Sequence, residues 1–92
     1  MSGSLPDGLE LVRTTEEFDE GSVPAGLLRD HRVAAGVWGR LVVRSGALRF
    51  AFGDAEEFDV GAGDTVVIPP EQVHHVSVDG AVRFVVEFHR IP

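Results

Sequence analysis

Two short β-rich runs follow one another in the stretch Val37-Trp38-Gly39-Arg40-Leu41-Val42-Val43-Arg44-Ser45-Gly46-Ala47-Leu48-Arg49-Phe50-Ala51-Phe52. The first run, Val37–Val43, is rich in Trp, Leu and Val and ends at the turn residues Arg44-Ser45-Gly46. In the second run, Leu48–Phe52, large apolar side chains alternate with other residues, which is the period of a half-buried strand. The stretch therefore predicts two strands separated by a turn.

Further β-rich runs follow toward the C-terminus, and turn residues separate them. They are Glu57–Val60, Thr65–Ile68, Val73–Val78 and Val82–Phe88. Asp79-Gly80, between the last two runs, is a strong signal for a two-residue hairpin. Six or seven strands at about 10-residue spacing, without helices between them, predict an all-β sandwich or barrel.

Length and charge limit the classes of protein to which this chain can belong. The chain has 92 residues and 15 acidic against 8 basic side chains, which gives a net charge of −7. This size allows one domain, for which homodimerisation is a route to added stability. We expect residues 1–8, rich in Ser, Gly and Pro, to form a flexible leader and residues 9–92 to form the domain.

Composition also argues against several partners and chemistries. The chain contains neither Lys nor Cys, so lysine Schiff bases, disulfides and Cys-type zinc sites are excluded. An acidic chain without a basic run predicts no nucleic-acid partner, and the lack of a long apolar run predicts no membrane partner. The N-terminus has no signal-peptide pattern, so we expect a cytoplasmic protein.

One segment resembles the second sequence motif of the cupins. In that motif a Gly, a Pro and a His stand at fixed spacing, and here they fall on Gly63, Pro69 and His74. The first cupin motif is only partly matched: Gly39 stands where the motif has a metal-binding Glu, and His31 alone stands for its His-x-His pair.

A second resemblance covers roughly Leu9 to Arg90. Four separated blocks are similar to a small cupin-like domain of unknown function that is found at the N-terminus of TehB-type tellurite-resistance proteins. The blocks are Leu27–Arg32, Ala35–Gly39, Ile68–Glu71 together with His74, and Arg83–Arg90. The resemblance implies a single cupin-like jelly-roll barrel or sandwich, and an association with tellurite resistance.

The resemblance also implies a metal site. His31, His74 and His89 would hold one divalent metal, Zn, Fe, Ni or Mn, because three imidazoles with an open position form a catalytic-type centre. Glu87 would be a fourth ligand or would orient an imidazole. The alternatives are a hydrogen-bonded histidine at a strand start for His74 and a solvated strand end for His89.

Three residues are candidate ligand-binding groups. Arg83 would supply charge to an anionic ligand, Glu87 would contact a polar group, and Trp38 would line the barrel interior. The alternatives are a core position for Trp38 and an ordinary surface ion pair for Arg83 and Glu87.

Two arrangements of the C-terminal strands are open. If Asp79-Gly80 forms a tight hairpin, His74 lies opposite Val85, and Glu87 and His89 share its face. If the two strands belong to opposite sheets, as the jelly-roll topology of cupins allows, Glu87 and His89 face outward while the phenylalanines fill the core.

The leading functional hypothesis is a protein that binds a small molecule or an oxyanion inside the barrel, with or without a histidine-bound divalent metal. The alternative is a non-enzymatic sensor or interaction module that binds no metal. A third hypothesis is a barrel with a purely structural role in dimerisation. The sequence identifies no catalytic residue and leaves open whether the protein is an enzyme.

Overall fold

The computed structural model describes residues 5–29 and 31–92. These residues form seven strands and one short 3-10 helix: β1 (Glu10–Thr14), β2 (Phe18–Asp19), η1 (Ala25–Leu28), β3 (Val37–Phe52), β4 (Phe58–Gly61), β5 (Thr65–Ile68), β6 (His74–Ser77) and β7 (Val82–Arg90). The predicted all-β fold is confirmed. Residues 1–4 of the predicted leader lie outside the described residues, and the domain boundary at residue 9 stays a prediction.

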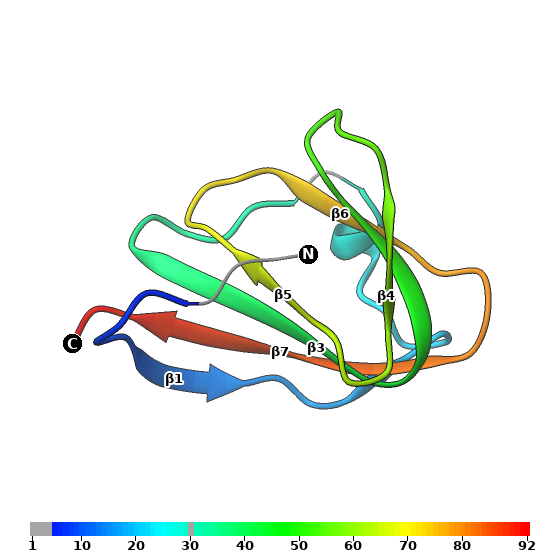
Figure 1. Ribbon diagram of the computed structural model, residues 1–92, viewed down its shortest axis with the longest axis horizontal. Helices are drawn as coiled ribbons and strands as arrows, with labels where there is room; N and C mark the ends of the chain where they lie inside the picture. The colour runs from blue at the N-terminus through cyan, green and yellow to red at the C-terminus, as the bar shows by residue number, and fades with distance from the viewer. Residues whose placement is uncertain (1–4, 30) are drawn as a thin grey trace.

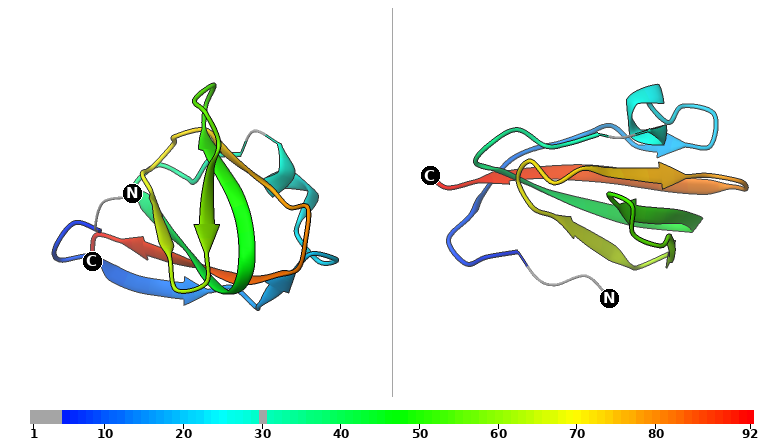
Figure 2. Two further views of the ribbon diagram at one scale, coloured as in Figure 1. Left: turned by 45° about the vertical axis from the view of Figure 1, so that its right-hand side comes forward. Right: turned by 90° about the horizontal axis from the view of Figure 1, so that it is seen from above.

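The central element is one strand, β3, of 16 residues. Its first part, Val37–Gly46, pairs with β7 on one side, and Gly39–Val42 pair with β5 on the other. Its second part pairs with β4 and β6 and builds a second sheet. β1 and β2 pair with the free edge of β7. Figures 1 and 2 show β3 curving from one sheet into the other.

The predicted turn at Arg44-Ser45-Gly46 is therefore wrong. The strand continues through these residues, and the pairing with β7 shifts by one residue between Val43 and Ser45. Such a β-bulge bends and twists a strand without reversing it. The same small, turn-forming residues thus serve to redirect β3 from the first sheet to the second.

The hairpin predicted at Asp79-Gly80 is also absent from the described part of the chain. β6 pairs with the second part of β3, whereas β7 pairs with the first part. The segment between Ser77 and Val82 consequently crosses from one sheet to the other. Of the two arrangements left open above, the structure has the one with the strands in opposite sheets.

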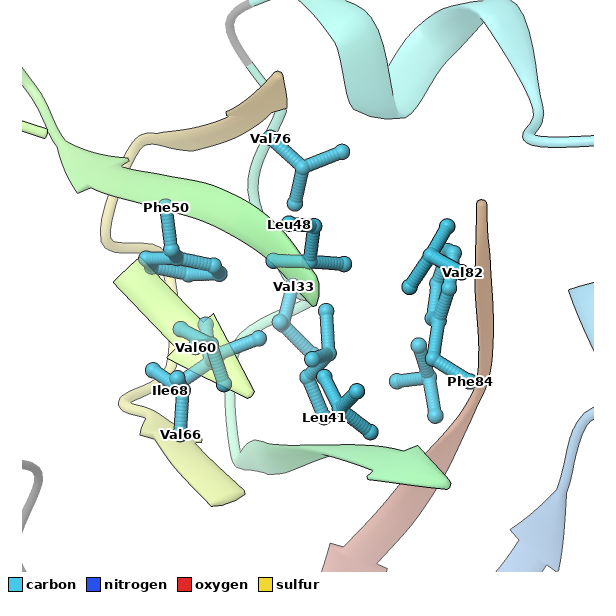
Figure 3. Close-up of a cluster of buried hydrophobic side chains, with 12 residues drawn as sticks. Val33, Leu41, Leu48, Phe50, Val60, Val66, Ile68, Val76, Val82 and Phe84 are labelled. Carbon is cyan, nitrogen blue, oxygen red and sulfur yellow. The ribbon is translucent and has the colours of Figure 1, made fainter. Parts of the chain in front are cut away.

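The two sheets face each other across an apolar core. Phe50 and Phe84 are fully buried in it, one from each sheet. Figure 3 shows side chains from both sheets pointing into this interior; the buried cluster comprises Val33, Leu41, Val43, Leu48, Phe50, Val60, Val66, Ile68, Val76, Val82, Phe84 and Val86. The architecture is the predicted single sandwich.

The remaining sequence-based expectations concern the location and the partners of the protein rather than its fold. Within residues 5–29 and 31–92, no helix is long and apolar enough to cross a membrane. The cytoplasmic location, the homodimer and the lack of a nucleic-acid partner stay predictions.

Closure of the sandwich depends on Gly46. Its backbone has φ of +70°, and a Cβ atom at this position would overlap the carbonyl oxygen of Ala81. Gly53 also has a positive φ, of +52°, but open space surrounds its missing Cβ. Substituting the two glycines therefore separates backbone strain from steric overlap.

We predict that Gly46→Ala lowers the free energy of unfolding by roughly 3 kcal/mol or more, because strain and overlap add. Gly53→Ala, which meets strain alone, should cost about 1 kcal/mol. Urea unfolding followed by the fluorescence of Trp38 measures both losses. Equal losses in the two variants would show that the contact with Ala81 does not limit the fold.

Candidate ligand-binding site

A cavity of about 210 Å³ lies between the sheets, next to η1. Most of its lining is apolar, and Val33, Leu41 and Val76 of this lining are among the side chains that point into the interior in Figure 3. Its polar lining side chains, among the described residues, are Arg13, Thr15, His31 and His74.

His74 is the buried polar residue of the interior, with 2% of its surface exposed. Its Nδ1–H donates a hydrogen bond to the carbonyl oxygen of Gln72 over 3.0 Å, because a carbonyl can only accept. The ring of Phe50 stacks on the imidazole at 5.5 Å between centroids and 8° between planes. These contacts fix the orientation of the imidazole.

Burial lowers the pKa of His74 below its usual 6.5; the hydrogen bond to Gln72 opposes this, and the nearby His31 and His75 lower the pKa further. The imidazole is therefore neutral at pH 7. Since Nδ1 carries the proton, Nε2 has a free lone pair. That nitrogen is a hydrogen-bond acceptor at the cavity wall.

His31 is held beside His74 by the backbone. The two residues exchange two N–H···O hydrogen bonds of 2.8 Å each, and their rings meet edge to face at 5.3 Å. Nδ1 of His31 is buried and has no hydrogen-bond partner among the described residues. Leaving a buried polar atom unpaired costs about 1–3 kcal/mol.

Arg13 reaches the cavity because of a bulge in β1. Leu11 lies opposite His89, but the next paired residue is Arg13, opposite Phe88. The guanidinium of Arg13 lies 5.5 Å from the centroid of the Phe88 ring, in the geometry of a cation–π contact.

Thr15 contributes no free polar group to the cavity. Its hydroxyl accepts a hydrogen bond from the backbone N–H of Val86 over 3.0 Å and donates one to the carbonyl of Glu16 over 2.9 Å. The groups of this lining left for a ligand are the guanidinium of Arg13 and the imidazoles of His31 and His74.

His89 and Glu87 lie on the other face of β7. Val86 and Phe88 line the cavity, and side chains alternate along a strand, so residues 87 and 89 point away from it. There Glu87 accepts hydrogen bonds from Arg40 at 2.9 and 3.3 Å and from Nε2–H of His89 at 3.0 Å. Burial acts to raise the pKa of Glu87, but these bonds outweigh it and leave the pKa below its usual value.

Neither Trp38 nor Arg83 belongs to the cavity lining. Trp38 pairs with His89 across β3 and β7 and shares its outward face. Arg83 is exposed and forms a 3.3 Å ion pair with Glu17, which also pairs with Arg44. The sequence pattern could not have revealed this partner, because Glu17 lies 66 positions away.

The structure brings His31 and His74 together but not His89. Across the described ranges, no three His, Asp or Glu side chains gather in a group that could hold a metal ion. Protein zinc sites use three or four protein ligands. The described residues bring together two of the three predicted ligands, and metal binding by His31, His74 and His89 stays a prediction.

Arg13, Phe88 and η1 form parts of the cavity wall that were not predicted from the sequence. Phe88 and Val86 carried a usable signal, because both alternate with Glu87 and share a face with the buried Phe84. The position of Arg13 carried no such signal, because the orientation of its side chain depends on a bulge in β1 that the local sequence pattern does not predict.

Solved structures of similar fold are cupin-like. The chain matches KdgF from Halomonas sp. with a TM-score of 0.61 and 18% identity, over 98% of this chain and 86% of that one. It matches a cupin-2 domain protein from Shewanella frigidimarina with a TM-score of 0.57 and 22% identity, over 91% and 72% of the two chains. The fold is thus a small cupin-like sandwich.

Two further structures are more similar. A protein from E. coli (strain K12) has a TM-score of 0.84 and 24% identity, over 97% of both chains. TehB from Haemophilus influenzae has a TM-score of 0.83 and 20% identity over 92% of this chain, which spans only 32% of TehB. No curated protein matches the chain. The family model of the TehB-like domain matches residues 13–86, so the chain belongs to this family.

The buried His74 makes stability depend on pH. Its pKa is lower in the folded chain than in the unfolded chain, so the unfolded chain binds more protons. The contribution of the neutral, buried His74 to the free energy of unfolding is complete above about pH 6.5, the pKa of histidine in the unfolded chain. It declines as the pH falls from there toward the pKa of His74 in the folded chain. We predict a lower urea midpoint at pH 5.5 than at pH 7.5, and a smaller difference in His74→Gln. His75→Gln is the matched control: it removes only the smallest of the causes that lower the His74 pKa, so it should keep most of the difference.

The outward network of Glu87 should stabilise the fold without serving the cavity. We predict that Glu87→Gln lowers the free energy of unfolding by about 1 kcal/mol, since its partner Arg40 is partly exposed. Urea unfolding measures this loss. Altered ligand binding in this variant would instead connect Glu87 to the cavity.

Proposed function

We propose that this TehB-like domain is a small-molecule binding module whose ligand enters the cavity between the two sheets. The observation that carries the proposal is a mostly apolar cavity lined by two neighbouring imidazoles, those of His31, whose buried Nδ1 is unpaired, and His74, whose Nε2 has a free lone pair. Ligand sites in proteins combine such apolar walls with a few polar groups that fix orientation.

The size and lining of the cavity define the ligand. An apolar cavity of roughly 150 Å³ holds a benzene molecule, so a cavity of about 210 Å³ accommodates a single ring or a short branched chain. The apolar wall favours an apolar body, and the histidine pair favours one polar group on it. We assign no catalytic residue.

This proposal favours an organic ligand over a bare oxyanion. A free oxyanion such as tellurite, suggested by the family resemblance, is strongly hydrated and would lose its water against valine, leucine and phenylalanine side chains. A divalent metal would meet only two imidazoles within the described part of the chain. Tellurite and Zn²⁺ are therefore comparison ligands in the test, and we expect both to bind more weakly than a ring compound.

The test is an NMR titration of the ¹⁵N-labelled protein with benzyl alcohol, a neutral ring compound with one hydroxyl. We expect saturable shifts of the amide signals of Val33, Leu41 and Val76, because these residues line the cavity. Saturable shifts confined to the outward face of β7, or no shifts at all, would overturn the proposal.

Two variants of η1 localise the site. Leu27 lines the cavity, whereas its neighbour Leu28 is 49% exposed and does not. We predict that Leu27→Trp fills the cavity and weakens benzyl alcohol binding at least tenfold, while Leu28→Trp binds as the wild type does. Equal affinities in the two variants would place the ligand elsewhere.

A further inference from the structure

The cavity carries a positive charge that the protein itself does not neutralise. Among the described lining residues there is no Asp or Glu, and Arg13 is the permanently charged side chain. Four other arginines form ion pairs with carboxylates: Arg40, Arg44, Arg49 and Arg83. Among the residues that the structure describes, Arg13, Arg29, Arg32 and Arg90 have no ion pair, and of these only Arg13 lines the cavity.

The fold also positions this charge. The bulge between Leu11 and Arg13 sets Arg13 opposite Phe88, and the guanidinium lies over the Phe88 ring. A planar guanidinium that stacks on a ring loses less freedom when it binds a carboxylate, and its N–H groups match the two carboxylate oxygens. The arrangement is that of an anion anchor beside an apolar cavity.

We propose that the ligand is a small organic carboxylate, whose carboxylate binds Arg13 and whose apolar body, carrying a hydroxyl or N–H group, donates a hydrogen bond to Nε2 of His74. This inference rests on the proposed binding function and adds the chemical class of the ligand. His74 requires a donor because its Nδ1–H is engaged by Gln72 and Nε2 can only accept. A neutral ligand would gain nothing from the charge of the guanidinium, whereas a carboxylate would.

The experiment compares four ring compounds: 4-hydroxybenzoate, benzoate, 4-hydroxybenzamide and benzyl alcohol. Their dissociation constants are measured at pH 7, where a benzoate carboxyl is ionised. Hydrogen bonds to charged groups contribute more binding energy than hydrogen bonds between neutral groups. The dissociation constant of 4-hydroxybenzoate should therefore be lower than that of 4-hydroxybenzamide by a factor of about ten or more. It should also bind more tightly than benzoate, which lacks the hydroxyl for His74.

The matched variants are Arg13→Gln and Arg44→Gln. Both remove one positive charge, but Arg44 does not line the cavity, and its partner Glu17 keeps Arg83. Arg13→Gln should remove the preference for carboxylate over amide and keep the preference for a hydroxyl. Arg44→Gln should keep both. Because Arg13 is exposed, its substitution is expected to leave the fold intact, which the NMR spectrum of the free variant checks.

The outcomes separate the two proposals. If the wild type binds benzyl alcohol in the cavity but does not prefer carboxylate over amide, the anion inference is overturned and the binding function stands. If Arg13→Gln and Arg44→Gln reduce the preference equally, overall charge accounts for it and Arg13 is not the anchor. If none of the four compounds binds in the cavity, the binding function itself fails.

Discussion

The structure depends on the path of a single strand, β3, which hydrogen-bonds to partners in both sheets. A strand can serve two facing sheets only if it bends sharply, and the shift between Val43 and Ser45 provides that bend. At Gly46 the chain also passes so close to Ala81 that no side chain fits. The packing of Phe50 from one sheet against the same interior as Phe84 from the other follows from this bend.

The cavity is a consequence of the same topology. Sheets that pack face to face fill the space between them with inward side chains, provided that strands cover both sides. Here part of the cover is the short helix η1 and the side chains of His31 and Val33 rather than a strand. A backbone bridge between His31 and His74 holds His31 against β6, and the imidazole of His31 forms part of the cavity wall. The interior is therefore incompletely filled at this end.

Local pattern was sufficient for the class of fold and for most strands. Alternation in Leu48–Phe52 and the apolar run Val82–Phe88 each corresponds to part of an observed strand. Pattern failed where the same residues suit two geometries. Arg44-Ser45-Gly46 fits a turn and a bulge equally well, and Asp79-Gly80 fits a hairpin and a crossover. Which geometry forms is decided by long-range pairing with β7, which no short window of sequence contains.

The candidate site was predictable to the extent that it depends on one face of one strand. His74 was identified from a resemblance, and the structure places it in the cavity wall with His31. His89 and Glu87 were grouped with it through a hairpin register that the structure does not have. Arg13 reaches the cavity through a bulge and a ring contact made 75 positions away, at Phe88.

The energetics of the two histidines favour binding over a purely structural role. A structural interior gains most from apolar side chains, because an unpaired buried nitrogen costs about 1–3 kcal/mol. His31 Nδ1 bears that cost in a domain of 92 residues, a size at which total stability is small. The neighbouring His74 is oriented by Gln72 and Phe50 so that its free nitrogen accepts rather than donates. A ligand that donates a hydrogen bond to Nε2 of His74 and brings a negative charge to Arg13 would supply partners that the described protein residues do not supply. Because such a ligand binds only the folded protein, its binding would also raise the free energy of unfolding.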